Sequence, residues 1–210
     1  MPNIHYTSNA KGIMIPPDGL TLITPAVGVA GNIFDFTEHL TDPGYTLPEL
    51  SEITEPHVVF GSLGESQLFQ RLAPMTFSMS TIGNHPALNQ VGGKHGTTIR
   101  IFEIDTAETV EDEVSARPRI AEYVMTGRMM TDTPEALAPG SLRKNTHVLT
   151  INSYRRWMYP VPREGQSVNR PQTPDLHIDY RARIYRRNGE AVYPQWEGFA
   201  LANELVNLSI

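Results

Sequence analysis

A histidine and an aspartate near the C-terminus have the spacing of metal ligands. His177 and Asp179 are separated by one residue, as are two of the three ligands of a facial-triad iron site, in which both side chains leave one face of a strand. The triad also needs a second histidine, and none follows position 177, so His95 or His147 would have to supply it. Two interpretations remain open. One is a small cupin-like barrel that is a metal-dependent enzyme or a ligand-binding protein; the other is a polar strand face on which Asp179 pairs with an arginine.

A glycine-rich segment, residues 92–98, has the composition of a phosphate-binding loop but not its spacing. A Walker loop needs glycine five residues before its Gly-Lys pair and Ser or Thr directly after it, whereas these positions hold Leu88 and His95. The chain has no cysteine and no G-x-S-x-G motif, which excludes thiol nucleophiles, cysteine-ligated metals and the nucleophile elbow. The sequence therefore favours a non-enzymatic protein with no catalytic residue, no cofactor and no resident metal.

Arginine and aromatic residues alternate in the segment 154–159, and more arginines follow after residue 180. Residues 143–187 contain ten basic and three acidic residues, although the whole chain has a formal charge of −6. Such residues concentrate in protein–protein interfaces, and they also stack on bases and hold phosphates. We expect an interaction site here, made by Tyr154, Arg155, Arg156, Trp157, Tyr159, Arg181, Arg183, Arg186 and Arg187. An ordinary strand with a packed tryptophan would explain the first five equally well.

The elements that position these residues are mainly strands. Apolar side chains alternate with polar ones in residues 75–80, 96–105 and 146–159, which is typical of half-buried strands, and residues 57–63 form a short β-branched run. Residues 175–193 are predicted to form a β-hairpin that turns at Asn188-Gly189. The spacing of Asp105 and Glu108 matches a capping box and predicts a short helix over 106–116. Residues 199–210 fit a helix or a terminal strand.

The N-terminal quarter has a different composition from the remainder. Residues 1–56 contain seven prolines together with many apolar residues, and residues 1–90 contain two basic and eight acidic residues. We therefore expect an extended, proline-rich arm at 1–56 that lies against its own domain or against a neighbouring subunit. Residues 57–210 are expected to form one β-sandwich or jelly-roll-like barrel, with one or two short helices.

These features favour a self-assembling structural protein, a subunit of a viral or phage particle such as a capsid, capsid-cementing or tail component. Its subunits would be held together by exchanged arms and by β contacts. The expected partners are copies of the chain and other particle proteins, with nucleic acid a minor possibility because the predicted pI is about 5.6. No window has the length of apolar sequence that a membrane-spanning helix needs, so we expect a virion protein assembled in the host cytoplasm, or otherwise a cytoplasmic one. The alternatives are the metal-dependent barrel with His177 and Asp179, and a nucleic-acid-binding module made by residues 143–187.

Overall fold

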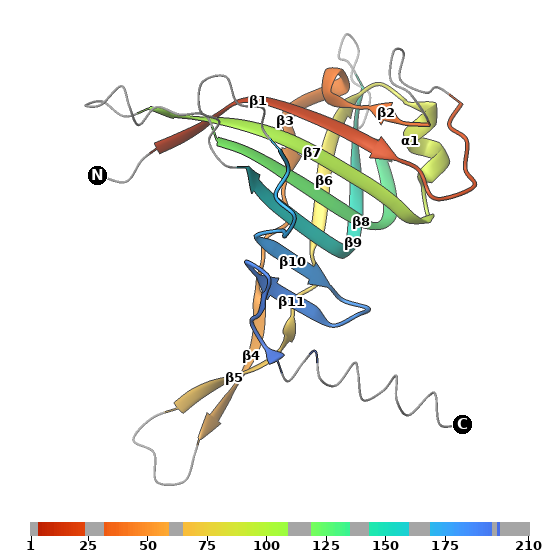
Figure 1. Ribbon diagram of the computed structural model, residues 1–210. Helices are drawn as coiled ribbons and strands as arrows, with labels where there is room; N and C mark the ends of the chain where they lie inside the picture. Colours follow the sequence, from red (N-terminus) through yellow and green to blue (C-terminus); the bar gives the residue numbers. More distant parts are fainter. Residues whose placement is uncertain are drawn as a thin grey trace.

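A large, curved antiparallel sheet dominates the structure (Figure 1). The computed structural model describes residues 4–23, 32–58, 65–108, 119–134, 143–159, 169–194 and 197. Four long strands lie side by side in the order β1, β7, β8 and β9. Their bounds are β1 (Ile4–Ile15), β7 (His95–Glu108), β8 (Arg119–Pro134) and β9 (Lys144–Tyr159).

These strands form because their apolar side chains recur at every second residue, so that one face of the sheet is buried. On β7 the buried side chains include Ile99 and Ile101, and on β8 they include Tyr123 and Met125. The pairing register places Ile101 opposite Tyr123, and it places Ile99 opposite Met125. We call the side of the sheet on which these residues lie the inner face, and the opposite side the outer face.

The sheet branches at β9, because this strand has two different neighbours on the side away from β8. Its first half, residues 144–150, pairs with β6 (Thr76–Ile82), and residues 153–156 pair with β10 (Leu176–Asp179). The branch through β6 continues to β3 (Leu40–Thr46), and the branch through β10 continues to β11 (Ile184–Arg187) and β12 (Glu190–Ala191).

Gly127 lies on β8 at the level of this branch. The register between β8 and β9 shifts there, since Thr126 pairs with Ser153 whereas Gly127 pairs with Ile151, which leaves Asn152 as an inserted residue, a β-bulge. A Cβ atom on Gly127 would lie 2.0 Å from the backbone oxygen of Thr150. The two strands can approach this closely only because residue 127 has no side chain.

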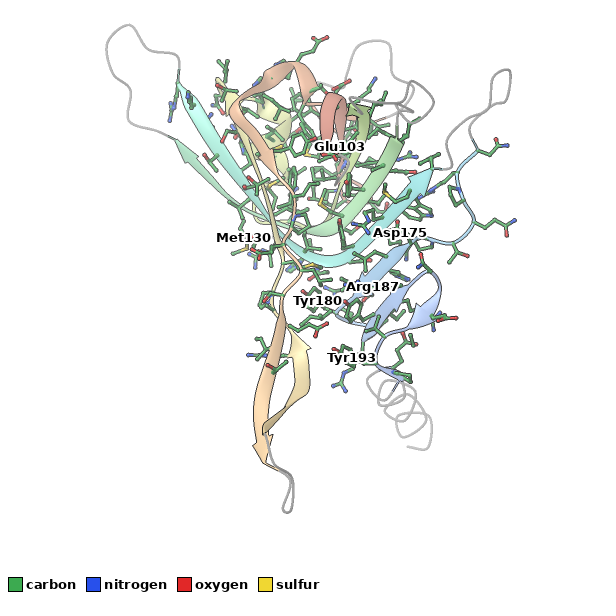
Figure 2. The ribbon with its side chains drawn as sticks, turned by 90° about the vertical axis from the view of Figure 1, so that its left-hand side faces the viewer. Glu103, Met130, Asp175, Tyr180, Arg187 and Tyr193 are labelled. Atoms are coloured by element: carbon green, nitrogen blue, oxygen red, sulfur yellow. The ribbon has the colours of Figure 1, made fainter. Side chains whose placement is uncertain are left out.

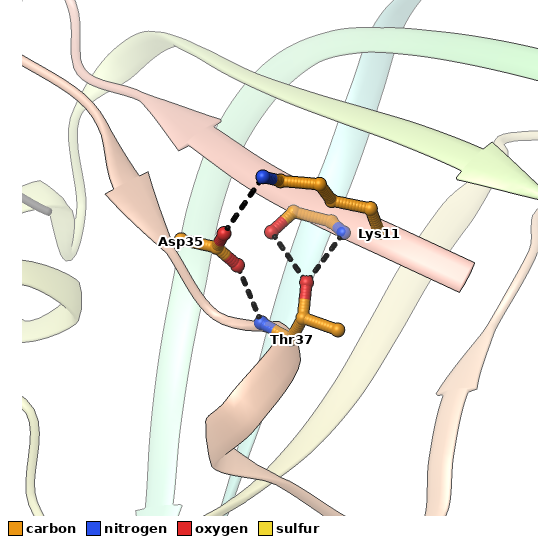
Figure 3. A network of polar contacts seen from close by, with 4 residues as sticks. Lys11, Asp35 and Thr37 are labelled. Carbon is orange, nitrogen blue, oxygen red and sulfur yellow. Dashed lines mark hydrogen bonds and ion pairs between the residues drawn. The ribbon is translucent and has the colours of Figure 1, made fainter. Parts of the chain in front are cut away.

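The chain connects the two ends of the strand order by a short turn. β2 (Phe34–Asp35) pairs with β1, and the one-turn helix η1 (Thr37–His39) leads directly into β3 at the other end. Figure 3 shows the contacts that hold this turn on β1: the Gly12 N–H donates to the Thr37 hydroxyl (2.8 Å), the Thr37 N–H donates to Asp35 (3.0 Å), and Lys11 pairs with Asp35 (3.5 Å). The curved sheet therefore brings β2, at its β1 end, close to β3, at the end of the branch through β6.

The hydrophobic core fills the inner side of this curl. The short helix α1 (Pro86–Val91) contributes three buried side chains to it, and β3 contacts β7 across it through a 2.6 Å hydrogen bond from the Tyr45 hydroxyl to Glu103. The largest fully buried core residues are Met14, Phe36, Met75, Phe77, Met79, Leu88, Ile99, Ile101, Met125, Met129, Leu149 and Tyr185.

A two-stranded ribbon projects from this body. β4 (Glu52–Val58) and β5 (Glu65–Leu72) pair with each other and form a sheet of their own. The ribbon extends away from the curved sheet in Figure 1. Its base is attached to the β10–β12 branch: the Tyr193 hydroxyl donates to Glu52 (2.8 Å), and the Tyr180 hydroxyl donates to the Ala73 carbonyl (Figure 2).

The prediction of a mainly β fold is confirmed, and the strands expected at 75–80, 96–105 and 146–159 correspond to β6, β7 and β9. The strand expected at 57–63 is described only at residues 57–58, which end β4. The helix expected at 106–116 does not begin at 106, because β7 continues to Glu108 through pairing with β1; residues 109–118 and 199–210 lie outside the described residues.

The extended arm expected at residues 1–56 is corrected by the described part of that segment. β1 lies inside the sheet between β7 and β2, and Met14 and Phe36 are fully buried in the core of their own chain. The prolines of this segment do not prevent folding, because Pro16 and Pro17 follow the end of β1, and Pro43 lies in β3, which has one described neighbour. The expected boundary at residue 56 falls inside β4.

The hairpin expected at 175–193 is confirmed at its turn and corrected before it. Asn188 and Gly189 both have positive φ, 51° and 86°, as a two-residue turn between β11 and β12 requires. The strand before that turn is divided in two by a turn at residues 180–183. This turn forms because the Asp179 carboxylate accepts the N–H groups of Arg181 and Ala182, each at 2.9 Å.

Substitution of Gly127 by alanine tests the close contact at the branch. We expect Gly127→Ala to lower the free energy of unfolding by about 3 kcal/mol, because the new methyl group meets backbone that no side-chain rotation can clear. The measurement is urea-induced unfolding. Gly92→Ala is the matched control, since its Cβ would lie 3.1 Å from the nearest atom, and equal losses in the two variants would contradict this account of the branch.

Candidate functional site

The structure does not assemble a metal site from the predicted ligands. His177 accepts a hydrogen bond at Nε2 from Arg155 Nε (3.2 Å), and burial together with that neighbouring arginine lowers the pKa of His177. Asp179 holds the turn after β10, and His147 lies in the core beside Thr81. No group of three or more His, Cys, Asp or Glu side chains close enough to bind a metal occurs in the described part of the chain.

One pocket does bring together two of the residues that the sequence singled out. His95 and Asp179 line a surface hollow of about 430 Å³ between the glycine-rich turn and the turn after β10; the other lining residues are Gly96, Thr126, Asn152, Ser153, Arg181 and Ala182. His177 is not part of it. Two backbone amides of the glycine-rich turn are already bonded, Gly93 to Met129 and Lys94 to Val91, so this segment acts as a turn and its amides do not form a phosphate cradle.

The arginine–aromatic segment 154–159 alternates between the two faces of the sheet as part of β9. Tyr154 lies in the core on the inner face, where burial raises its pKa to about 12. Arg156 pairs with Asp175 at 2.6 Å. Trp157 is only 6% exposed, whereas Arg155 is exposed on the outer face. Tyr154, Arg156 and Trp157 are therefore engaged in contacts within their own chain.

The arginines after residue 180 lie on the β10–β12 branch, which pairs with β9, and His177 is opposite both Arg155 and Arg186. Arg181 and Arg183 belong to the turn that follows β10. Arg186 on β11 pairs with Glu197 (2.9 Å), and the guanidinium of Arg187 lies 5.9 Å from the ring centroid of Tyr185. The nine predicted interaction residues thus divide among the inner face, the outer face and the β10–β12 branch, and they do not form one patch.

A buried carboxylate on the outer face was not anticipated. Glu122 on β8 has no exposed side-chain surface, and it binds Arg100 at 2.7 Å, Arg170 at 3.1 Å and the Tyr159 hydroxyl at 2.5 Å. The Arg170 guanidinium lies 3.6 Å from the centroid of the Trp157 ring, a cation–π contact. Because Arg170 belongs to the connection between β9 and β10, these contacts attach that connection to the sheet.

The outer face is apolar as well as charged. The register of β1, β7, β8 and β9 places alternate residues of these strands on it, and they include Lys11, Ile13, Ile15, Thr98, Arg100, Phe102, Ile104, Ile120, Glu122, Val124, Thr126, Arg128, Ser153, Arg155, Trp157 and Tyr159. Most of the apolar residues among them are half-buried, and Ile104 is 36% exposed. The core elements β3, β6 and α1 lie behind the sheet in Figure 1, and the 169–175 connection crosses in front of it.

The sheet also has an open edge along β1. Residues 4–11 of β1 pair with β7 on one side, and no strand among the described residues pairs with their other side. Unpaired backbone N–H and C=O groups at such an edge can bond to a strand of another chain.

No protein-family model matches the chain, and no curated protein matches it. Within the described residues, no helix is long and apolar enough to cross a membrane. The outer face and the β4–β5 ribbon are therefore the candidate functional surfaces, on the ground of geometry alone.

One sequence signal could have indicated the Glu122 cluster. Glu122 is a lone carboxylate between apolar residues in the segment 119–125, which was not singled out as a strand. Acidic residues are seldom fully buried unless they are paired. A strand prediction for β8 would therefore have raised the question of its partner, although not the answer.

Loss of the Glu122 carboxylate should destabilise the protein. We expect Glu122→Ala to lower the free energy of unfolding by about 2–3 kcal/mol, because it leaves two arginines without their shared partner. Glu122→Gln keeps the volume and should cost less. Burial and the Glu122 hydrogen bond together raise the pKa of Tyr159 to about 12, so in Glu122→Gln this pKa should fall towards 10. Denaturant unfolding and NMR titration of labelled tyrosine rings measure both effects; an unchanged Tyr159 titration would contradict them.

Proposed function

We propose that this protein is a non-enzymatic, self-assembling structural protein, a subunit of a viral or phage particle such as a capsid, capsid-cementing or tail component. The observation that supports this most directly is the projecting β4–β5 ribbon. Its partners would be other copies of the chain and further particle proteins.

A two-stranded ribbon is a poor independent structure. Two antiparallel strands without a third strand or a covering helix are marginally stable in water at best. β4 and β5 pair at seven positions, from Glu52 with Leu72 to Val58 with Glu65. Besides Leu72, which is buried in the core of its own chain, the sequence of this segment includes Ile53, Val58, Val59, Phe60, Leu63, Leu68 and Phe69. An apolar ribbon of this length gains stability when another subunit covers it.

The open edge of β1 is a second place where copies can join. Its unpaired backbone groups are suited to β-strand addition, in which a strand of a neighbour extends the sheet. The ribbon and this edge are different surfaces of one molecule, so a contact that either makes with another surface of a neighbouring copy is head-to-tail. Contacts of that kind generate rings or filaments, which is the construction that particle subunits use.

The ribbon replaces the N-terminal arm in this proposal. An arm of residues 1–56 is not available for exchange in its described part, because β1 and β2 belong to the sheet of their own chain. The ribbon projects from the body, and contacts with Tyr180 and Tyr193 attach its base.

Shortening the ribbon tests the proposal. Replacement of residues 55–68 by Asn-Gly joins Thr54 to Phe69, which are already paired, by a two-residue turn that suits a hairpin. We expect the wild-type protein to form large, regular assemblies and the shortened protein to be a folded monomer, as measured by light scattering and negative-stain imaging. Ile23→Ser, which removes an apolar side chain that is 68% exposed elsewhere, should assemble normally. Assembly of the shortened chain to the wild-type size would contradict the proposal.

A further inference from the structure

We propose that the outer face of β1, β7, β8 and β9 is the docking surface for the β4–β5 ribbon of a second copy of this chain. This inference rests on the proposed function, and it adds the surface that receives the ribbon.

This sheet has apolar residues on both of its faces. A sheet with one face in water normally alternates apolar and polar residues, whereas a sheet with two apolar faces is covered on both sides. The inner face packs on the core of its own chain. On the outer face, Ile13, Phe102, Ile120 and Val124 are only half-buried, and Ile104 is exposed at the level of 36%. The described connection at 169–175 covers Trp157 and Glu122 but leaves these residues accessible.

The outer face and the β4–β5 ribbon also carry opposite charge. The described cations of the outer face are Lys11, Arg100, Arg128, Arg155 and, from the connection that crosses it, Arg170. Asp35 pairs with the first of these, and Glu122 is shared by Arg100 and Arg170. Arg155 has no ion pair among the described residues, because its described partner is neutral His177. The face therefore has an excess of positive charge.

The ribbon has the opposite charge. From Glu49 to Glu65 the sequence contains four glutamates and no basic residue, and Arg71 is the only cation of the ribbon strands. Glu52 is occupied by its hydrogen bond to Tyr193. Glu55 and Glu65 are the other two glutamates in the sequence of these strands, which thus contain three acidic residues and one arginine.

The outer face is also large enough to receive the ribbon. Four neighbouring strands at about 4.8 Å spacing make a surface roughly 15 Å wide, and two strands make a ribbon roughly 5 Å between axes and 10 Å with side chains. Seven paired positions at about 3.3 Å give a ribbon length of roughly 23 Å, which matches seven residues of β7 or β8. The ribbon therefore fits on the outer face without extending past its strands.

A nucleic acid is the alternative occupant for a cationic face. It is disfavoured because Asp35 and Glu122 already form ion pairs with three of the cations, because apolar residues lie between them, and because the chain has a net charge of −6. Nucleic-acid binding is therefore treated as an outcome that the test can detect.

The experiment exchanges charges between the two surfaces of the full-length chain. Arg155→Glu places a negative charge on the outer face, and the double substitution Glu55→Arg with Glu65→Arg reverses the ribbon. We expect each change alone to raise at least tenfold the protein concentration needed for assembly. The combination of all three substitutions should bring that concentration most of the way back to the wild-type value. Arg143→Glu is the matched control, since Arg143 is exposed and precedes β9 at the end that pairs with β6, and it should assemble like the wild type. Val124→Lys tests the apolar part of the face and should also weaken assembly.

The outcomes separate this inference from the proposed function. Circular dichroism and thermal unfolding confirm that each variant is folded. If shortening the ribbon prevents assembly but Arg155→Glu and Val124→Lys do not, the ribbon docks elsewhere and only the receiving face is overturned. If the wild-type protein is a monomer at every concentration, the proposed function fails as well. If Arg155→Glu removes a salt-sensitive binding of single-stranded DNA and leaves assembly unchanged, nucleic acid is the occupant and the docking inference is wrong.

Discussion

The close approach of β8 and β9 at Gly127 is the contact on which the arrangement of the sheet depends. At this level the β9 backbone is shared between two branches, because the Ile151 N–H donates to Met75 beside β6 and the Asn152 carbonyl accepts from Tyr180 beside β10. A bulge in β9 turns its direction, and the absence of a side chain at residue 127 lets β8 follow. The branch through β6 and β3 then covers the core, and the branch through β10 supports the ribbon.

A second constraint is that the sheet has apolar residues on both of its faces, and each face must be covered. On the inner face the requirement is met by β3, β6 and α1. On the outer face it is met only in part, by the connection that Glu122 holds through Arg170. The proposals on assembly follow from this difference, since they assign the remaining apolar surface and the projecting ribbon to each other.

The hypotheses drawn from sequence have unequal standing in this fold. The metal hypothesis required His177 and Asp179 to bind one metal ion together. His177 instead contacts Arg155, and Asp179 stabilises a turn. The interaction hypothesis for residues 154–159 treated the segment as a unit, although neighbouring residues of a strand point to opposite faces. Of this segment, the docking proposal uses only Arg155, whose interaction role is still a prediction. The assembly hypothesis is still a proposal, now with the ribbon in place of the arm.

The sequence by itself determined where several strands lie and which side of each is apolar, because alternation is a local property that adjacent residues specify. It also determined the turn at Asn188-Gly189, since both residues tolerate positive φ. Only the tertiary structure decided that β1 enters the sheet, because its pairing with β7 joins residues about ninety positions apart. The same holds for the outer face: Glu122 is buried by Arg100, Tyr159 and Arg170, which come from three separate segments, and no local pattern records that these segments meet.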